Sequence, residues 1–462
     1  MTKYLGLILI IAVAALAFFS YAYIPKSELT YERVPSIVSG NVSSSTVQDK
    51  EAVVTDTRLV TEHIPLPQQV KAIYMTSCVA GTPSFRDRLV KLINETEINS
   101  VVIDIKDYSG TISFLPENEA WLPAWQNARC GARDMREFVA GLHSQGIYVI
   151  GRITVFQDPF YSVKFPHLAV KRLDGNTVWR DGKGLSFIDV AAREYWDHIV
   201  ELSVDSYNLG FDELNFDYVR YPSDGNMRDI SFPHTDGSKW PGDKRANLEA
   251  FFVYLNEELD KEEKFSAYRH KNTGRASSTP WTSVDLFGMT TTNFDDLSIG
   301  QVIERAAPYF DFVAPMVYPS HYPKSFLGLG DPNLYPYKVV NYAMSSGVAR
   351  MKASTTPMDG FLHERIGTST PAVYKKPVYT ADKLRTWVQD FDYGGNYDIK
   401  EVRDEIQASY DAGVMSFMIW APSNIYTKGA LKGPDTYEVM IGTSTSTRST
   451  TNLSEPVVKA SD

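Results

Sequence analysis

The sequence lacks the basic clusters that are typical of nucleic-acid-binding proteins. Its 46 Lys and Arg residues are outnumbered by 56 Asp and Glu residues, which gives a formal net charge of -10. Binding to nucleic-acid phosphates depends on clustered Lys and Arg side chains. We therefore expect no nucleic-acid partner.

Several cofactor and catalytic motifs are also absent. No Gly-rich phosphate loop follows an expected strand, and neither Gly-x-Ser-x-Gly nor His-Glu-x-x-His occurs. The histidines are few and scattered, and we interpret His143, His198, His270 and His363 as core or surface residues rather than metal ligands. The sequence therefore predicts neither a metal site nor an organic cofactor.

Cysteine is scarce as well, since only Cys78 and Cys130 occur. In an exported protein the two could form a disulfide. Two separate buried thiols explain the sequence equally well. The pair is too small a set to hold a metal ion, so these two alternatives remain.

The N-terminus has the pattern of an export segment. A single Lys precedes the apolar run Leu5–Phe19, and the small residues Ser20 and Ala22 offer a cleavage site. Counted as Tyr4–Ile24, the same run is long enough to span a bilayer. Residues 1–24 are therefore expected to be a membrane anchor or a cleaved signal peptide. The rest of the chain would be anchored outside the cytoplasmic membrane in the first case and secreted in the second.

Composition divides the remaining chain into three parts. Residues 25–67 are rich in Ser, Thr, Val and Glu without a sustained hydrophobic period, which predicts a flexible tether. Residues 441–462 contain a Ser/Thr low-complexity stretch, which predicts a disordered tail. Residues 68–440 form the expected folded domain.

Strand-like and helix-like segments alternate through this domain. The expected strands are Lys71–Ser77, Val101–Lys106, Ile147–Phe156, Gly210–Pro222, Trp281–Gly288, Asp311–Tyr318, Leu384–Phe391 and Val414–Trp420. The expected helices are Phe85–Glu97, Ala132–Ser144, Arg193–Asn208, Lys244–Asp260, Gly300–Tyr309, Asn333–Ser346 and Ile399–Asp411. This alternation predicts an α/β fold, a (β/α)8 TIM barrel. The seventh strand has the weakest signal, because Thr356–Thr380 is Pro-rich and irregular.

The fourth strand has one apolar and one polar face. Side chains alternate along a strand, so Glu213, Asn215 and Asp217 share one face, opposite apolar neighbours. In a parallel barrel the helices cover one face and the other lines the interior. Carboxylates in an interior are costly unless they are paired or used.

The same alternation predicts inward polar residues on other strands. Strand two supplies Asp104 and Lys106, strand three Arg152, strand five Asp285, strand six Tyr318, strand seven Gln389 and strand eight Trp420. Barrel interiors often hold ionic layers, and Lys106 and Arg152 could neutralise Asp104 and Glu213 in such a layer. A structural role therefore remains an alternative for each of these residues.

Asp217 and Asp285 are the best candidates for chemistry. Both come late in neighbouring strands, near the carboxyl ends where barrel enzymes place their active sites. Two carboxylates suffice for glycosidic cleavage, since one protonates the leaving oxygen and the other attacks or activates water. The charge of one raises the pKa of the other. We assign Asp217 as nucleophile or stabilising base and Asp285 as acid/base.

A further set of polar and aromatic residues lies at strand ends and is expected to bind substrate. His321, just past strand six, could instead cap its loop. The candidates are Asp104, Lys106, Asp107, Arg152, Asp158, Glu213, Asn215, Arg220, Tyr318, His321, Trp387, Gln389 and Trp420.

Six segments together resemble a family of glycosyl hydrolase-like TIM-barrel domains of unknown function. They are 102–110, 151–159, 210–222, 284–288, 314–322 and 387–391, and the resemblance extends over nearly all of Val70–Tyr426. It implies binding of a polysaccharide. Strand four is also similar to the chitinase pattern of spaced acids, but Asn215 replaces an acid, and Val219 and Arg220 occupy the place of the catalytic Glu. This departure argues against a substrate-assisted chitinase mechanism.

Two functions follow as hypotheses. The first is a glycoside hydrolase that cleaves a cell-wall or extracellular polysaccharide by a two-carboxylate mechanism. The alternative is a non-catalytic carbohydrate-binding envelope protein, which would be favoured if Asp217 and Asp285 were both buried in salt bridges with Lys106 and Arg152. A lyase or transferase would use similar residues. The sequence predicts neither the sugar nor the oligomeric state.

Overall fold

The computed structural model describes residues 62–265 and 279–434. The expected anchor or signal segment 1–24, residues 25–61 of the expected tether and the expected tail 441–462 lie outside these ranges. Among the helices of the described ranges, none combines the length and the apolar character needed to cross a membrane.

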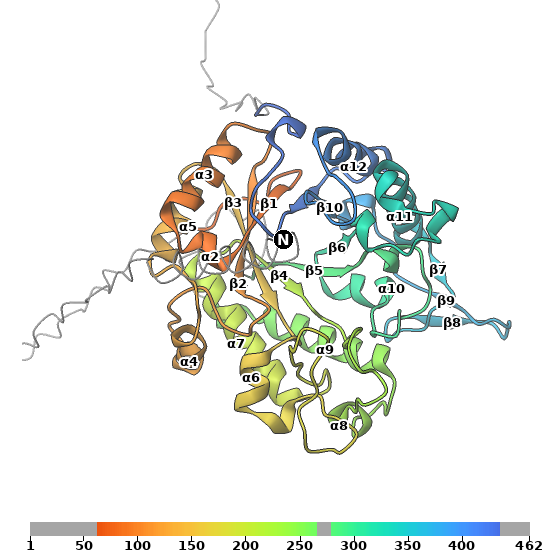
Figure 1. Cartoon of the computed structure of the whole chain (residues 1–462). Helices are drawn as coiled ribbons and strands as arrows, with labels where there is room; N and C mark the ends of the chain where they lie inside the picture. Colours follow the sequence, from red (N-terminus) through yellow and green to blue (C-terminus); the bar gives the residue numbers. More distant parts are fainter. Residues whose placement is uncertain (1–61, 266–278, 435–462) are drawn as a thin grey trace, which may run out of the picture. The chain divides into compact units, whose positions relative to one another are not determined.

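Eight parallel strands close into a barrel, which confirms the predicted (β/α)8 topology (Figure 1). They are β1 (Lys71–Met75), β2 (Ser100–Lys106), β3 (Tyr148–Thr154), β4 (Glu213–Asp217), β5 (Trp281–Phe287), β6 (Phe312–Met316), β10 (Thr386–Gln389) and β11 (Phe417–Trp420). Their order around the barrel is β1-β11-β10-β6-β5-β4-β3-β2. The weakly signalled seventh strand, β10, is present in the expected place.

Helices surround the strands in Figure 1. They are α2 (Ser77–Ala80), α3 (Pro83–Asn94), α4 (Leu122–Gln126), α5 (Met135–His143), α6 (Pro159–Lys164), α7 (Arg193–Leu209), α8 (Pro233–Asp236), α9 (Lys244–Leu259), α10 (Ile303–Ala306), α11 (Pro336–Lys352) and α12 (Ile399–Asp411). The prediction of a helix over Gly300–Tyr309 was wrong in length. Only the short α10 and a 3-10 turn form there, because Pro308 cannot continue an α-helix.

Local sequence signals explain where elements begin and end. Asp398 and Glu401 form a capping box at the start of α12, which satisfies backbone N–H groups that have no partner within the helix. Between α7 and β4, Gly210 has a φ of 136°, a conformation that side chains disfavour. This glycine ends α7 and turns the chain into the strand that carries the central acids.

The barrel divides the core into two parts. Outward residues such as Leu214 and Phe216 of β4 pack in the large apolar cluster that also contains helix residues. A smaller cluster combines inward residues of several strands, among them Tyr148, Trp387 and Met418. The inner cluster fills the barrel with side chains, so the site must lie above it, at one end.

The Pro-rich stretch before β10 contains a small antiparallel sheet that the sequence did not predict. Its strands are β7 (Thr355–Thr356), β8 (Glu364–Ile366) and β9 (Val373–Lys375), in the order β7-β9-β8. Figure 1 shows this sheet at the edge of the molecule, outside the ring of barrel strands. Strands of two or three residues carry too little alternation to be detected in a sequence.

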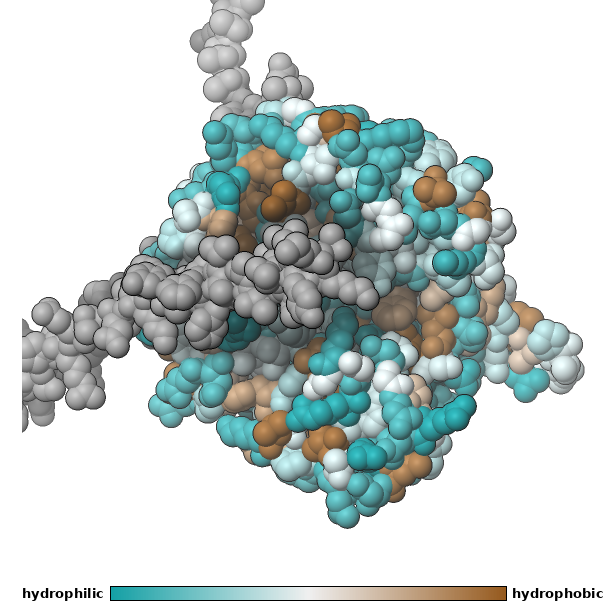
Figure 2. Space-filling view, in the orientation of Figure 1, coloured by the Kyte–Doolittle hydropathy of each residue, from teal (hydrophilic) through white to brown (hydrophobic). Residues whose placement is uncertain are grey.

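Cys78 and Cys130 form a disulfide. The bond joins α2, which follows β1, to the loop that precedes α5. The structure therefore decides between the two alternatives that the sequence left open. On the face shown in Figure 2, hydrophilic residues prevail over the described periphery, and hydrophobic residues occur in small separate groups.

Candidate active site

A cavity of about 300 Å³ opens at the carboxyl ends of the barrel strands. Asp217 ends β4, and Met316 and Trp420 end β6 and β11. Eight of the residues proposed from the sequence line this cavity: Arg152, Asp217, Arg220, Asp285, Tyr318, His321, Trp387 and Trp420. This is the end of a barrel at which enzymes of the fold carry their active sites.

Asp217 is held as a carboxylate with several donors. Its Oδ2 accepts hydrogen bonds from Nε and Nη2 of Arg152 at 3.1 and 2.5 Å. Its Oδ1 accepts from the backbone N–H of Tyr218 at 2.5 Å. Tyr218 has a φ of 52°, an uncommon conformation for a residue other than glycine. The chain thus adopts a strained turn directly after the carboxylate, as is frequent at functional sites.

Asp285 is a buried carboxyl group that forms no salt bridge with any residue of the described ranges. It is 1% exposed, and Nδ2 of Asn215 and Nε1 of Trp387 donate to its Oδ1 at 2.9 and 2.8 Å. Within the described ranges no donor contacts Oδ2. Burial, followed by the charge of Asp217, raises the pKa of Asp285 well above its ordinary value. The group is therefore suited to carry a proton on Oδ2.

The two acids are neighbours across adjacent strands. The register of β4 and β5 pairs Asn215 with Ser283 and Phe216 with Val284, so Asp217 and Asp285 follow in the next row. Asn215 also donates to Ser283 Oγ at 3.0 Å. Its amide therefore ties β4 to β5 directly beneath the two carboxyl groups.

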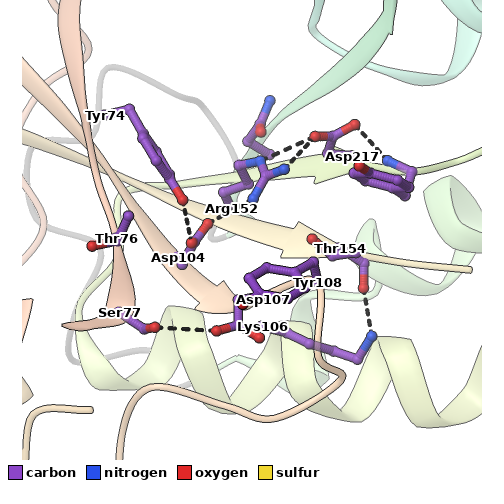
Figure 3. Close-up of polar contacts among 12 residues, drawn as sticks. Tyr74, Thr76, Ser77, Asp104, Lys106, Asp107, Tyr108, Arg152, Thr154 and Asp217 are labelled. Carbon is purple, nitrogen blue, oxygen red and sulfur yellow. Dashed lines mark hydrogen bonds and ion pairs between the residues drawn. The ribbon is translucent and has the colours of Figure 1, made fainter. Parts of the chain in front are cut away.

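A chain of polar contacts supports Asp217 from the far side (Figure 3). The hydroxyl of Tyr74 donates to Asp104 Oδ2 at 2.5 Å, and Arg152 Nη1 donates to Asp104 Oδ1 at 2.7 Å. Arg152 thus bridges Asp104 and Asp217. Burial raises the pKa of Asp104 to about 6. Asp104 itself lies behind the arginine and does not line the cavity, so it can orient Arg152 but not contact a ligand there.

Aromatic side chains form one wall of the cavity. Trp387 and Trp420 meet edge to face with ring centroids 5.7 Å apart, and Tyr74 stacks on Trp420 at 4.0 Å. Tyr318 completes this wall. Flat apolar rings beside carboxyl groups form the kind of surface on which the faces of sugar rings can pack.

His321 lies at the outer rim. Its Nδ1 is 2.9 Å from Ser320 Oγ, and its ring stacks on Tyr393 with a centroid distance of 5.8 Å. Loss of solvation, with the charge of Lys183, lowers the pKa of His321. A neutral imidazole at this rim can donate or accept a hydrogen bond.

One comparison decides the family. Residues 72–426 match the family model described as "Putative glycosyl hydrolase domain". The chain belongs to this family. No curated protein matches the chain.

Three solved structures show similarity to this member of the glycosyl hydrolase domain family. A hypothetical protein from Ruminiclostridium thermocellum is 30% identical over 41% of this chain and 93% of its own, with a TM-score of 0.35. The glycoside hydrolase domain of PgaB (BpsB) from Bordetella bronchiseptica is 12% identical over 81% and 99%, with a TM-score of 0.49. The α-galactosidase TtGalA from Thermus thermophilus is 11% identical over 79% and 61%, with a TM-score of 0.41.

Glu213 of this family member belongs to a closed ionic layer below the cavity. Arg385 Nη1 donates to both of its carboxylate oxygens, at 2.6 and 2.8 Å, and the hydroxyl of Tyr148 donates to Oε2 at 3.3 Å. The Arg385 guanidinium also lies 3.5 Å from the centroid of the Phe312 ring. Glu213 is therefore fully engaged and does not reach the cavity.

Of the ionic layer that the sequence left as an alternative, Arg152 does pair with Asp104, whereas Lys106 pairs with neither Asp104 nor Glu213. The register of β2 with β3 shifts between Asp104 and Lys106. Such a bulge changes the direction of the side chain that follows it, here that of Lys106. Its Nζ donates to the carbonyl of Thr154 at 2.6 Å (Figure 3). The same Nζ lies 3.0 Å from Asp158 Oδ2. Lys106 and Asp158 are both buried in this pair, outside the cavity that holds the other candidates.

Two more candidates make internal contacts instead of facing the cavity. Asp107 accepts from Ser77 Oγ at 3.2 Å and from Ser109 Oγ at 2.6 Å in the loop after β2. Gln389 Oε1 accepts from Ser320 Oγ at 2.7 Å, next to His321. Gln389 therefore holds the rim loop in place rather than facing a ligand.

Sequence reasoning missed several residues that matter here. Arg385 shares its strand face with Trp387 and Gln389, so alternation within the expected strand would have placed it inward. Phe287 likewise shares the face of Asp285 and lines the cavity. Tyr218 also lines it, and its positive φ leaves no signal in the sequence. No group of three or more metal-ligating side chains occurs within residues 62–265 and 279–434.

Proposed function

We propose that this protein is a glycoside hydrolase that cleaves a cell-wall or extracellular polysaccharide with Asp217 and Asp285. One observation carries the proposal: a buried carboxyl group, which has no salt bridge to any described residue, lies beside a carboxylate that is ion-paired with Arg152. A non-catalytic binding protein would be favoured if both acids were buried in salt bridges with Lys106 and Arg152. Asp217 has such a bridge, with Arg152, but Asp285 has none with either residue.

In the proposed reaction Asp285 acts as the general acid and Asp217 as the nucleophile. Asp285, protonated on Oδ2, donates its proton to the glycosidic oxygen while Asp217 attacks the anomeric carbon and the bond to the leaving sugar breaks. The ionised Asp285 then removes a proton from water, which attacks the anomeric carbon and releases Asp217. Arg152 limits the charge that Asp217 presents to Asp285 during this cycle.

The register favours retention of configuration at the anomeric carbon. Neighbouring strands lie about 4.8 Å apart. Asp217 and Asp285 each follow directly after the last paired residues of β4 and β5, Phe216 and Val284, so they continue the same row. Carboxyl groups of retaining enzymes are about 5–5.5 Å apart, whereas inverting enzymes separate them by about 6.5–9.5 Å to admit a water molecule. Same-row neighbours match the shorter separation.

We further propose that the enzyme works outside the cytoplasmic membrane. The Cys78–Cys130 disulfide supports this location, because such bonds persist mainly in oxidising compartments. The N-terminal segment expected to export or anchor the chain is consistent with it.

The test is product analysis on a panel of purified glycans. Wild-type protein should release oligosaccharides from at least one of them, and Asp217→Asn should abolish that release. Asp404→Asn provides the control, because Asp404 forms a salt bridge with Lys400 on the surface of α12 and no other with the residues that the structure describes. Release that is unaffected by Asp217→Asn would end the catalytic assignment.

A further inference from the structure

Arg220 is a buried cation in the wall of the cavity. It lies in the loop after β4, is 9% exposed and lines the same cavity as Asp217 and Asp285. Its Nη1 donates to the carbonyl of Tyr221 at 3.0 Å and to Ser223 Oγ at 3.2 Å. Within the described ranges, its Nε and Nη2 make no hydrogen bond.

This arginine differs from the other buried arginines of the described ranges. Each of the others lies within 4.0 Å of at least one carboxylate: Arg152 of Asp104 and Asp217, Arg305 of Glu249 and Asp359, Arg350 of Glu304, and Arg385 of Glu213. Arg220 has no such partner among residues 62–265 and 279–434. A buried charge without a partner is costly, and here its free N–H groups belong to a side chain that borders the site.

Neighbouring rings hold the guanidinium in place. Its Cζ lies 4.8 Å from the centroid of the Tyr218 ring, 5.0 Å from that of Phe287 and 6.0 Å from that of Phe187. These contacts and the two Nη1 hydrogen bonds restrict the orientation of the side chain. The unused Nε and Nη2 form the fork that binds a carboxylate through two parallel hydrogen bonds.

The proposed reaction indicates what an unpaired cation beside the site would bind. Positive charge develops on the sugar ring during glycosidic cleavage, and a bare arginine nearby would oppose that charge. An anionic group on the substrate would remove the conflict.

We propose that Arg220 binds a carboxylate of the sugar held in this cavity, so that the substrate is an acidic glycan whose sugar carries a carboxyl group. This inference rests on the proposed function and names its substrate class.

The experiment compares an acidic glycan with its carboxyl-reduced form. Uronic-acid and muramic-acid glycans serve as probes, and carboxyl reduction converts the carboxylate to an alcohol. We expect kcat/KM of the wild-type protein to fall about 10- to 100-fold on reduction, the range of a charge-assisted hydrogen-bond pair. Arg220→Gln should cause the same loss on the acidic form and no further loss on the reduced form. Arg220→Lys should restore part of the difference.

Two controls separate this inference from a folding defect. Arg172→Gln removes an exposed arginine that pairs with Asp229, and it should leave the preference unchanged. Calorimetric titration of the Asp285→Asn protein with both glycan forms measures binding without turnover. Arg220→Gln in that background should weaken binding of the acidic form alone.

Failure of this inference can be distinguished from failure of the proposed function. Cleavage of neutral glycans that is indifferent to Arg220→Gln would overturn the inference and leave the hydrolase intact. Arg220-dependent binding of acidic glycans without any cleavage would support the inference and end the proposed function. A preference for sulfated over carboxylated glycans would overturn the carboxylate assignment.

Discussion

Glu213 and Asp217 lie on the same face of β4, four residues apart, yet their surroundings differ. Both oxygens of Glu213 bind Arg385, and the pair is closed below the cavity. Asp217 shares Arg152 with Asp104 and lines the cavity, next to Asp285, which forms no salt bridge in the part of the chain that the structure describes. In the lower layer, Glu213 and Arg385 neutralise each other. In the upper layer, Arg152 pairs with Asp217 and leaves Asp285 without a salt bridge among the described residues.

Position along the strand therefore does not by itself make an acid functional. Near the middle of the barrel a buried carboxylate persists when its own cation matches it. At the carboxyl end the structure leaves one acid, Asp285, with an unused oxygen and a raised pKa. Incomplete pairing, rather than acidity or burial, marks the candidate site.

The largest expected effect follows from changing the nucleophile. Asp217→Asn keeps the shape of the side chain but removes the charge that attacks the anomeric carbon. We expect kcat to fall by at least about 10³-fold. Steady-state hydrolysis of the glycan that the wild-type protein cleaves provides the measurement. A variant with more than a tenth of wild-type activity would place the nucleophile elsewhere.

The matching change in the lower layer should affect stability instead. Glu213→Gln leaves the buried Arg385 without its counter-ion, so we expect a loss of about 3 kcal/mol in the free energy of unfolding. Denaturant unfolding measures it, with Asp285→Asn for comparison. Because Asp285→Asn leaves no cation unpaired, it should cost far less. Equal losses in the two variants would erase the distinction between the layers.

A smaller change tests how Asp104 acts through Arg152. Asp104→Asn removes the negative charge that helps to orient Arg152, whereas the salt bridge between Arg152 and Asp217 remains. We expect kcat to fall about 10-fold with little change in KM, since charge-assisted hydrogen bonds contribute about this much. A change confined to KM would mean that Asp104 contacts the substrate after all.

The smallest effect concerns the donors to Asp285. Trp387→Phe removes a hydrogen bond that favours the ionised form, so the pKa of Asp285 should rise further. The alkaline limb of the pH–rate profile should then move to higher pH, while kcat at the optimum changes by less than about 10-fold. A shift to lower pH would contradict the assigned role of the tryptophan.

Strand alternation and the order of segments were enough to predict the barrel and to bring Asp217 and Asp285 to one end. The β-strand period is strict, so inward faces follow from sequence wherever a strand is regular. Lys106 was misplaced because a bulge breaks that period locally. The partner of Glu213 was missed because Arg385 lies 172 residues away along the chain. Which of many buried ions stays unpaired depends on such distant contacts, so Arg220 could not be distinguished in advance.

The most direct test of the account is the leaving-group dependence of Asp285→Asn. A variant without its general acid should lose most activity on natural glycans. With aryl glycosides that carry acidic phenol leaving groups, bond cleavage needs no proton, so the first turnover should release the phenol at nearly the wild-type rate, and later turnovers should be slow because Asp285 also activates the water. Wild-type activity on natural glycans should fall as the pH rises through the raised pKa of Asp285, and the variant should lack that alkaline limb. Equal losses in the first-turnover rate on both substrate types, or an unchanged alkaline limb, would contradict the assignment of Asp285 as the acid.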